Sequence, residues 1–249
     1  MKVCLAHSFL RSPIAHRGLH CENINCPENS LWSAQRAIGA GYGIEIDLQL
    51  SGDDRAIVFH DNTLDRMTLQ TGDVDGYNAA ELENITLKGS TENIPTLESF
   101  LQIVNGRVPL LIEIKGKTRE NVKTDGKLEW ATARALLDYA GFVAVMSFNP
   151  HAIAHMEQFA PQIPRGLTTE AIGGAGKNFS ASELKSFYKQ ANASFLCHSV
   201  SDINSHIVNN VKTKHDPLLC WTVRSKKQEI LARKVADNII FENYWPNLP

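Results

Sequence analysis

Two stretches of this 249-residue chain carry charged residues two positions apart, Glu45 with Asp47 and Glu113 with Lys115. Residues two apart in a β-strand project from the same face. The residues between them are apolar, so the charged pairs would point into a sheet interior, where an unpaired charge is very costly. Three carboxylates suit an oxygen-liganded Mg²⁺ or Ca²⁺. We predict one divalent cation on Glu45, Asp47 and Glu113; the alternative is a buried salt-bridge network in which Lys115 neutralises Glu113.

Two histidines and an arginine at predicted strand ends extend this set. His16 and Arg17 close the first strand, and His60 closes a later one. Imidazoles, whose ordinary pKa lies near neutrality, suit general acid/base chemistry. The guanidinium of Arg17 suits paired phosphate oxygens, and its alternative is an ion pair with Glu28 or Asp61. The combination predicts metal-dependent phosphodiester hydrolysis, and we favour His16 as the base and His60 as the acid.

These residues must be positioned by strands that meet at one edge. Short β-branched runs alternate with segments of helical period along the whole chain, which is typical of an α/β fold with a parallel sheet. Capping residues at Asn149, Ser180 and Ser225 mark three helix starts. Nine runs predict strands, over Ile14–His16, Ile44–Leu50, Ala56–His60, Leu110–Lys115, Val143–Phe148, Pro164–Thr168, Ser194–His198, Leu218–Val223 and Asn238–Phe241.

One of these nine strands is not expected in the parallel sheet. The loop between Ile44–Leu50 and Ala56–His60 is too short for a helical crossover, so the two runs should form an antiparallel hairpin. The remaining strands then form a (β/α)₈ TIM barrel with its chemistry at the carboxyl rim. The return arm of the hairpin would bring His60 back toward the acids.

Composition excludes several classes of protein. The chain is 43% hydrophobic and 21% charged with a formal net charge of -2, which argues against disorder and against nucleic acid as a partner. Its first residues are too weakly apolar for a secretory signal and too few to span a bilayer. We expect a single domain over residues 1–249 that is cytoplasmic and makes no membrane contact. Neither the oligomeric state nor the alcohol groups of a substrate leave a mark in the sequence.

Cysteines and the remaining histidines fall outside the predicted site. Five scattered cysteines without a C-x-x-C pair fit a reducing compartment. A pairing of Cys21 with Cys26, or a metal held by them, is the weaker interpretation. We expect the other seven histidines at the surface, among them His151, His155, His206 and His215.

Seven short motifs occur in one order and spacing over residues 14–115. They are Ile14–Gly18, Pro27–Ser30, Glu45–Asp47, His60–Asp61, Leu64–Arg66, Ile94–Leu97 and Glu113–Lys115. In these motifs the chain resembles the glycerophosphodiester phosphodiesterase family. The resemblance implies hydrolysis of a glycerophosphodiester to an alcohol and glycerol 3-phosphate. It also implies phosphate contacts from Arg17 and Lys115, and a small cap over residues 62–93 beside the barrel mouth.

The resemblance implies supporting roles as well. Glu28 would lie near the metal, and Phe148 and Trp221 are candidates for lining the pocket. The chain departs from the family's pattern in the extra residues between Gly18 and Pro27, in Arg224, and in the final Ile240–Asn243. Specificity for another small phosphodiester is therefore an alternative. Two others are a barrel that abstracts a proton next to a carboxylate and a non-catalytic barrel that binds phosphorylated ligands or a protein.

Overall fold

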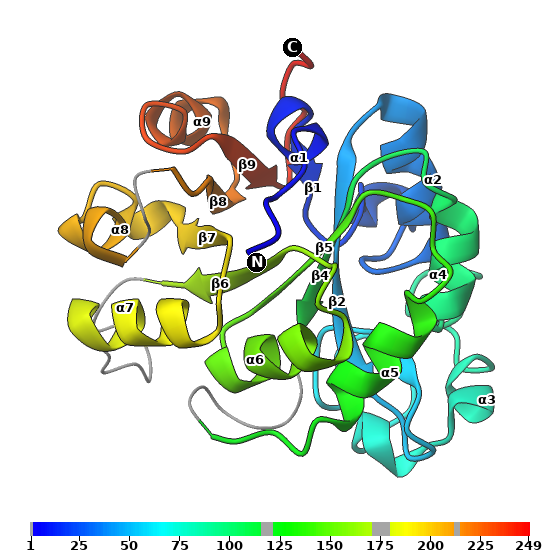
Figure 1. The fold of residues 1–249 in the computed structure, drawn as a ribbon. Coiled ribbons are helices and arrows are strands. Elements are labelled where there is room, and N and C mark those ends of the chain that lie inside the picture. Colours follow the sequence, from blue (N-terminus) through cyan, green and yellow to red (C-terminus); the bar gives the residue numbers. More distant parts are fainter. Residues whose placement is uncertain (1, 116–121, 171–179, 212–214) are drawn as a thin grey trace.

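The computed structural model describes residues 2–115, 122–170, 180–211 and 215–249. Within these ranges eight parallel strands form a closed ring, in which β1 pairs with both β2 and β9 (Figure 1). The ring strands are β1 (Ile14–Ala15), β2 (Gly43–Leu50), β4 (Leu110–Ile114), β5 (Val143–Ser147), β6 (Arg165–Thr169), β7 (Phe195–Ser199), β8 (Leu218–Val223) and β9 (Asn238–Phe241). The predicted TIM barrel is confirmed, with strand ends shifted by at most two residues.

The ninth strand, β3 (Ala56–Val58), lies outside the ring. It pairs antiparallel with β2, with Leu48 opposite Val58 and Leu50 opposite Ala56. The backbone N–H of Phe59 continues the pairing by donating to the Asp47 carbonyl at 3.0 Å. The hairpin predicted from the short loop is therefore present, and its return arm ends beside the acidic positions of β2.

The longer helices surround the ring in Figure 1. They are α2 (Leu31–Ala40), α4 (Leu97–Val104), α5 (Lys127–Ala135), α6 (Pro150–Phe159), α7 (Ala181–Gln190), α8 (His206–Val211) and α9 (Lys226–Ala232). The predicted caps are present: Ser180 forms a full capping box with Glu183, and the Asn149 side chain accepts from the His151 N–H. Ser225 accepts from Gln228 N–H, but the Gln228 side chain accepts from Arg224 instead of closing the box.

Two apolar layers leave one end of the barrel for chemistry. Leu111, Phe195 and Leu219 fill the interior of the ring, and Leu5 and Phe9 pack against this cluster from the N-terminal segment that contains α1 (Ser8–Arg11). The opposite strand faces pack against the helices in a larger cluster. Because the interior is filled by apolar side chains toward the amino end, the polar residues gather at the carboxyl rim.

The segment over residues 62–93, for which we keep the name cap, has an apolar cluster of its own. Leu64, Val74, Leu82 and Ile85 pack there with Phe59 from the hairpin. The cap contains a 3₁₀ turn (Val74–Gly76) and the short helix α3 (Ala79–Leu82). Its packing is therefore separate from the interior of the barrel.

One histidine contradicts the expectation of surface positions. His198, on β7, is fully buried because its side of the strand faces the layer between ring and helices. A hydrogen bond of 2.7 Å joins its Nδ1 to the Thr169 hydroxyl. Burial lowers the pKa of His198, and the carboxylate of Asp202, 3.8 Å from Nε2, offsets this only in part.

This burial predicts an acid-sensitive contribution to stability. Because its pKa is lowered, His198 takes up a proton less readily in the folded protein than in the unfolded chain, where the ordinary pKa is 6.5. Between that value and the lower pKa of the folded state the unfolded chain binds more protons, so the free energy of unfolding falls by up to about 1.4 kcal/mol for each pH unit. His198→Gln should remove this part of the pH dependence, while His215→Gln at an exposed site should leave it. The measurement is urea unfolding of the unaltered protein and the two variants at about pH 7.5 and about pH 5.5. An equal loss of unfolding free energy between the two pH values in all three proteins would contradict the prediction.

Candidate active site

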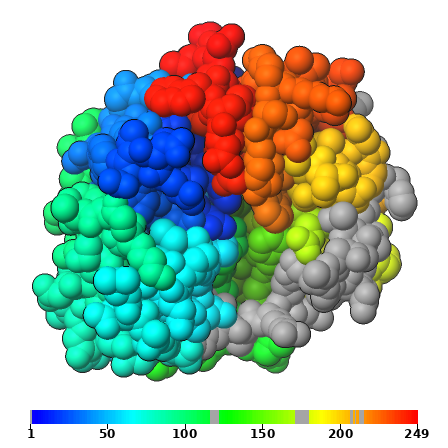
Figure 2. All heavy atoms as spheres, turned by 180° about the vertical axis from the view of Figure 1, so that it is seen from behind, coloured from blue at the N-terminus to red at the C-terminus, as the bar shows by residue number. Residues whose placement is uncertain are grey.

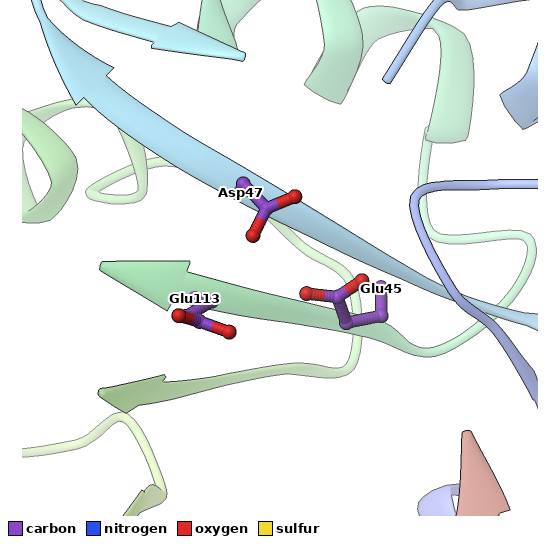
Figure 3. A group of neighbouring side chains, drawn as sticks. All are labelled: Glu45, Asp47 and Glu113. Atoms are coloured by element: carbon purple, nitrogen blue, oxygen red, sulfur yellow. The ribbon is translucent and has the colours of Figure 1, made fainter. Parts of the chain in front are cut away.

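The three predicted metal-binding acids lie together at the barrel interior (Figure 3). Glu45 and Asp47 project from β2, and Glu113 projects from β4, where it pairs in register with Asp47. One oxygen from each carboxylate lies within 4.8 Å of the others. All three side chains are buried. The alternation of charged and apolar residues in these strands thus places three acids on one face, as predicted.

The electrostatics of this cluster favour a bound cation. Burial, and then the charges of Asp47 and Glu113, raise the pKa of Glu45 well above its usual value. Burial also acts to raise the pKa of Asp47, but Lys115, His60 and Arg17 together hold it below its usual range. Among the described residues, Oε1 of Glu45 has no hydrogen-bond partner. Since buried like charges and an unpartnered oxygen are costly, this group of acids fits a divalent cation.

Two cationic side chains are anchored on the acids. Nζ of Lys115 lies 2.9 Å from Glu113 Oε1 and 3.4 Å from Asp47 Oδ1. Nε of Arg17 lies 3.3 Å from Asp47 Oδ2, and its Nη1 donates to Glu28 at 2.8 Å. Burial acts to lower the pKa of Lys115, but the two carboxylates raise it by more than burial lowers it. The ammonium therefore stays charged. The ion pairs that we considered as alternatives for both residues are therefore present.

A left-handed turn directs the backbone after β1 at the same cluster. Arg17 and Gly18 have φ values of 56° and 76°, a conformation that is uncommon for residues other than glycine. The Arg17 N–H donates to Glu45 Oε2 at 2.9 Å. A Cβ on Gly18 would lie 2.2 Å from the Ser33 hydroxyl oxygen. Only glycine fits there, which explains the Arg–Gly pair at this strand end.

His16 is held by an acid that the sequence reasoning gave no role. Its Nδ1 lies 2.6 Å from Glu242 Oε2, and its Nε2 lies 4.0 Å from Glu45 Oε2. Burial lowers the pKa of His16, although the bond to Glu242 opposes this. In the neutral form Nδ1–H donates to Glu242, leaving Nε2 free to accept a proton beside the acidic cluster.

His60 also has a carboxylate partner. Its Nδ1 lies 2.6 Å from Asp61 Oδ1. Its carbonyl accepts from the Gln49 side chain at 2.9 Å. With its side chain 27% exposed, His60 is more open to solvent than His16 at 12%. The two imidazoles thus occupy unequal environments, one enclosed and one near the mouth.

Three further residues at the rim were missed. Asn29 donates to Asp47 Oδ2 at 3.0 Å and accepts from the Asp47 N–H at 3.2 Å, which fixes that carboxylate. Arg224 donates to Glu242 at 2.6 Å, and His20 Nε2 lies 3.8 Å from Glu242. Asn29 lies within the Pro27–Ser30 motif, so the motif could have indicated it. The contact of His20 with Glu242 could have been inferred from barrel closure, which puts the ends of β1 and β9 side by side.

The mouth of the site is a hollow. Figure 2 shows it bordered by the segment after β1 in blue, the cap in cyan and the last part of the chain in orange and red. The rings of Phe148 and Trp221 pack edge to face with centroids 5.4 Å apart, and Trp221 donates to the Thr169 carbonyl. A cavity of about 320 Å³ adjoins Lys115 and is lined, among others, by Gln49, Asn62 and Lys123.

A closed parallel barrel whose rim carries clustered acids, two cations and two histidines defines a barrel enzyme. A model of the glycerophosphoryl diester phosphodiesterase family matches residues 16–243. The chain therefore belongs to this family of phosphodiester hydrolases, as its motifs predicted. No helix in the described ranges is long and apolar enough to cross a membrane.

Individual relatives agree with this assignment. The chain is 31% identical to a glycerophosphodiester phosphodiesterase of Caldanaerobacter subterraneus subsp. tengcongensis, over 92% of this chain and 93% of that protein. It is 36% identical to one of Bacillus altitudinis, over 86% of each. A solved phosphodiesterase from Oleispira antarctica, in complex with the product sn-glycerol-3-phosphate, superposes with a TM-score of 0.79 at 24% identity, over 96% and 95% of the two chains.

Proposed function

We propose that this protein hydrolyses glycerophosphodiesters to an alcohol and glycerol 3-phosphate, with one Mg²⁺ or Ca²⁺ held by Glu45, Asp47 and Glu113. The observation that carries the proposal is the unpartnered Glu45 oxygen within a buried cluster of three acids. Family membership and the product bound by the Oleispira relative support the substrate class. The cation, when bound, would stabilise the charge that develops on the phosphate.

The side chains of this chain account for binding and proton transfer. Arg17 and Lys115 bind the non-bridging phosphate oxygens, because both are charged, partly buried and aimed at the cluster. His16 accepts a proton at Nε2 from the nucleophile, which is water or a neighbouring substrate hydroxyl. With the hydroxyl, departure of the alcohol leaves a cyclic phosphodiester, which one water then opens to glycerol 3-phosphate. Glu242 stabilises the resulting imidazolium. His60 donates a proton to the leaving alcohol oxygen, and Asp61, 2.6 Å from its Nδ1, orients the ring.

The surroundings of the site have proposed roles too. The cap covers the substrate at the mouth, and Phe148 with Trp221 lines the opposite side. Glu28 supports Arg17 rather than a metal, given its contact at 2.8 Å. The whole of residues 1–249 acts as one domain. Five free thiols support a reducing, cytoplasmic location.

The test is hydrolysis of several glycerophosphodiesters, with glycerol 3-phosphate measured as the product. We expect turnover that a chelator abolishes and that add-back of Mg²⁺ or Ca²⁺ restores. Turnover unchanged by complete metal removal would contradict the metal site. Cleavage of a chromogenic bis-phosphodiester alone would indicate another small phosphodiester, and no cleavage of any substrate would favour a non-catalytic barrel.

A further inference from the structure

Arg66 in the cap grips two carboxylates with one guanidinium. Its Nε and Nη2 donate to the two oxygens of Asp61 at 2.6 and 3.0 Å. Its Nη2 and Nη1 donate to the two oxygens of Glu28 at 2.6 and 3.1 Å. Such paired, charge-assisted contacts fix orientation as well as distance. Asp61 follows the β2–β3 hairpin and Glu28 follows β1, so Arg66 links two separate parts of the rim.

Each of these carboxylates holds a group of the proposed mechanism. Asp61 Oδ1, one of the oxygens bound by Arg66, lies 2.6 Å from Nδ1 of His60. Glu28 Oε1 accepts from Arg17 at 2.8 Å as well as from Arg66. The chain of contacts therefore runs from His60 through Asp61, Arg66 and Glu28 to Arg17. A shift of Arg66 would alter both the acid and the phosphate ligand.

The charges of this network also depend on Arg66. Although burial acts to raise the pKa of Glu28 and of Asp61, contacts with Arg66 and with Arg17 or His60 hold both below their usual ranges. Without Arg66, the side-chain partners left among the described residues would be the guanidinium of Arg17 for Glu28 and the imidazole of His60 for Asp61. Each carboxylate would then be free to rotate toward its remaining partner.

Arg66 is dispensable for packing. Its side chain is 47% exposed and lies outside the apolar cluster of the cap. The cap backbone at this point is held independently, since the Lys88 ammonium donates to the carbonyls of Asp65 and Arg66. Loss of the guanidinium should therefore leave the fold in place.

We propose that Arg66 is a positioning residue, which orients His60 through Asp61 and Arg17 through Glu28, and so couples the cap to both. This inference rests on the proposed function. It assigns the cap a part in catalysis beyond covering the substrate. Because the grip uses the planar fork of a guanidinium, lysine is not an equivalent replacement.

The experiment compares Arg66→Ala and Arg66→Lys with the unaltered protein under metal-saturated conditions. We expect Arg66→Ala to lower kcat/KM about 10- to 100-fold, the scale of a displaced catalytic group, with kcat lower and KM higher. Arg66→Lys should recover little of this. Guanidinium ion at non-denaturing concentration should restore part of the activity of Arg66→Ala, since the site is exposed enough to admit it.

Two single substitutions separate the contacts of Arg66 with Asp61 from its contacts with Glu28. Asp61→Asn should act mainly on kcat through His60, whereas Glu28→Gln should act mainly on KM through Arg17. Binding of glycerol 3-phosphate, measured by calorimetry without turnover, should weaken in Glu28→Gln and Arg66→Ala but not in Asp61→Asn. The matched control is Arg55→Ala, which removes another partly exposed arginine outside this network. Arg55 pairs with Glu98 at 3.0 Å.

The outcomes are distinct. Arg66→Ala with the kinetics of Arg55→Ala would overturn the positioning role while leaving the proposed function standing. A loss of activity that guanidinium ion does not restore, together with unchanged affinity for glycerol 3-phosphate, would also overturn it. Absence of hydrolysis by the unaltered, metal-loaded protein would overturn the proposed function and this role with it.

Discussion

Asp47→Asn is expected to lower kcat/KM about 100- to 1000-fold, the scale for losing one preorganised electrostatic group of an active site. Asp47 is central because it faces Glu45 and Glu113, lies 3.3 Å from Arg17 and 3.4 Å from Lys115, and is fixed by Asn29. The amide removes one charge from the proposed metal site while preserving shape. It also leaves Arg17 and Lys115 without their shared anion.

Metal binding distinguishes this effect from misfolding. Titration calorimetry should show markedly weaker binding of Mg²⁺ or Ca²⁺ to Asp47→Asn, while thermal unfolding in chelator remains cooperative. Asp54→Asn is the matched control, because Asp54 is half exposed and pairs with Lys127 at 3.0 Å. A variant that kept both its metal affinity and its turnover would refute the role of the acidic cluster.

His16→Ala should lower kcat about 100- to 10,000-fold, the range for a removed general base or acid. Glu242→Gln should cost less, at least about tenfold, because the histidine remains while the charge that stabilises its protonated form is lost. The 2.6 Å contact between the two residues predicts that the effects are not additive. A double variant should be hardly slower than His16→Ala alone.

Steady-state kinetics of the two single variants and the double variant measures this coupling. His60→Ala provides the comparison, since its partner is Asp61 and its loss should combine with Glu242→Gln as an independent change. Near-normal turnover of His16→Ala would remove this histidine from the mechanism. Fully additive losses for His16 and Glu242 would show that the carboxylate acts elsewhere.

The acidic centre was predictable because its signal is local. Alternation along β2 and β4 alone determines which side chains share a face, and Glu45, Asp47 and Glu113 followed from it. The hairpin of β2 and β3 was equally local, since the length of one loop excluded a crossover. In a barrel built from short repeated strand and helix units, short stretches of sequence are enough to predict strand faces and hairpins.

The partners of the histidines were missed because they depend on closure of the ring. His16 and Glu242 are 226 positions apart, and they meet only because Ala15 pairs with Phe241. His198 was misjudged for a related reason. Its surroundings include Thr169 on the neighbouring strand, and a histidine within a strand can face either layer. Pairing across strands, rather than residue type, decided both cases.

The separate apolar cluster beneath the cap has an evolutionary consequence. Leu64, Val74 and Leu82 pack among themselves and with the hairpin. Most of the cap sequence can therefore diverge without disturbing the strands of the barrel. Lineages of this fold could exchange such segments and thereby acquire new leaving groups, with the phosphate chemistry inherited unchanged. Arg66 would be the exception, a single position that every replacement segment has to retain or reinvent.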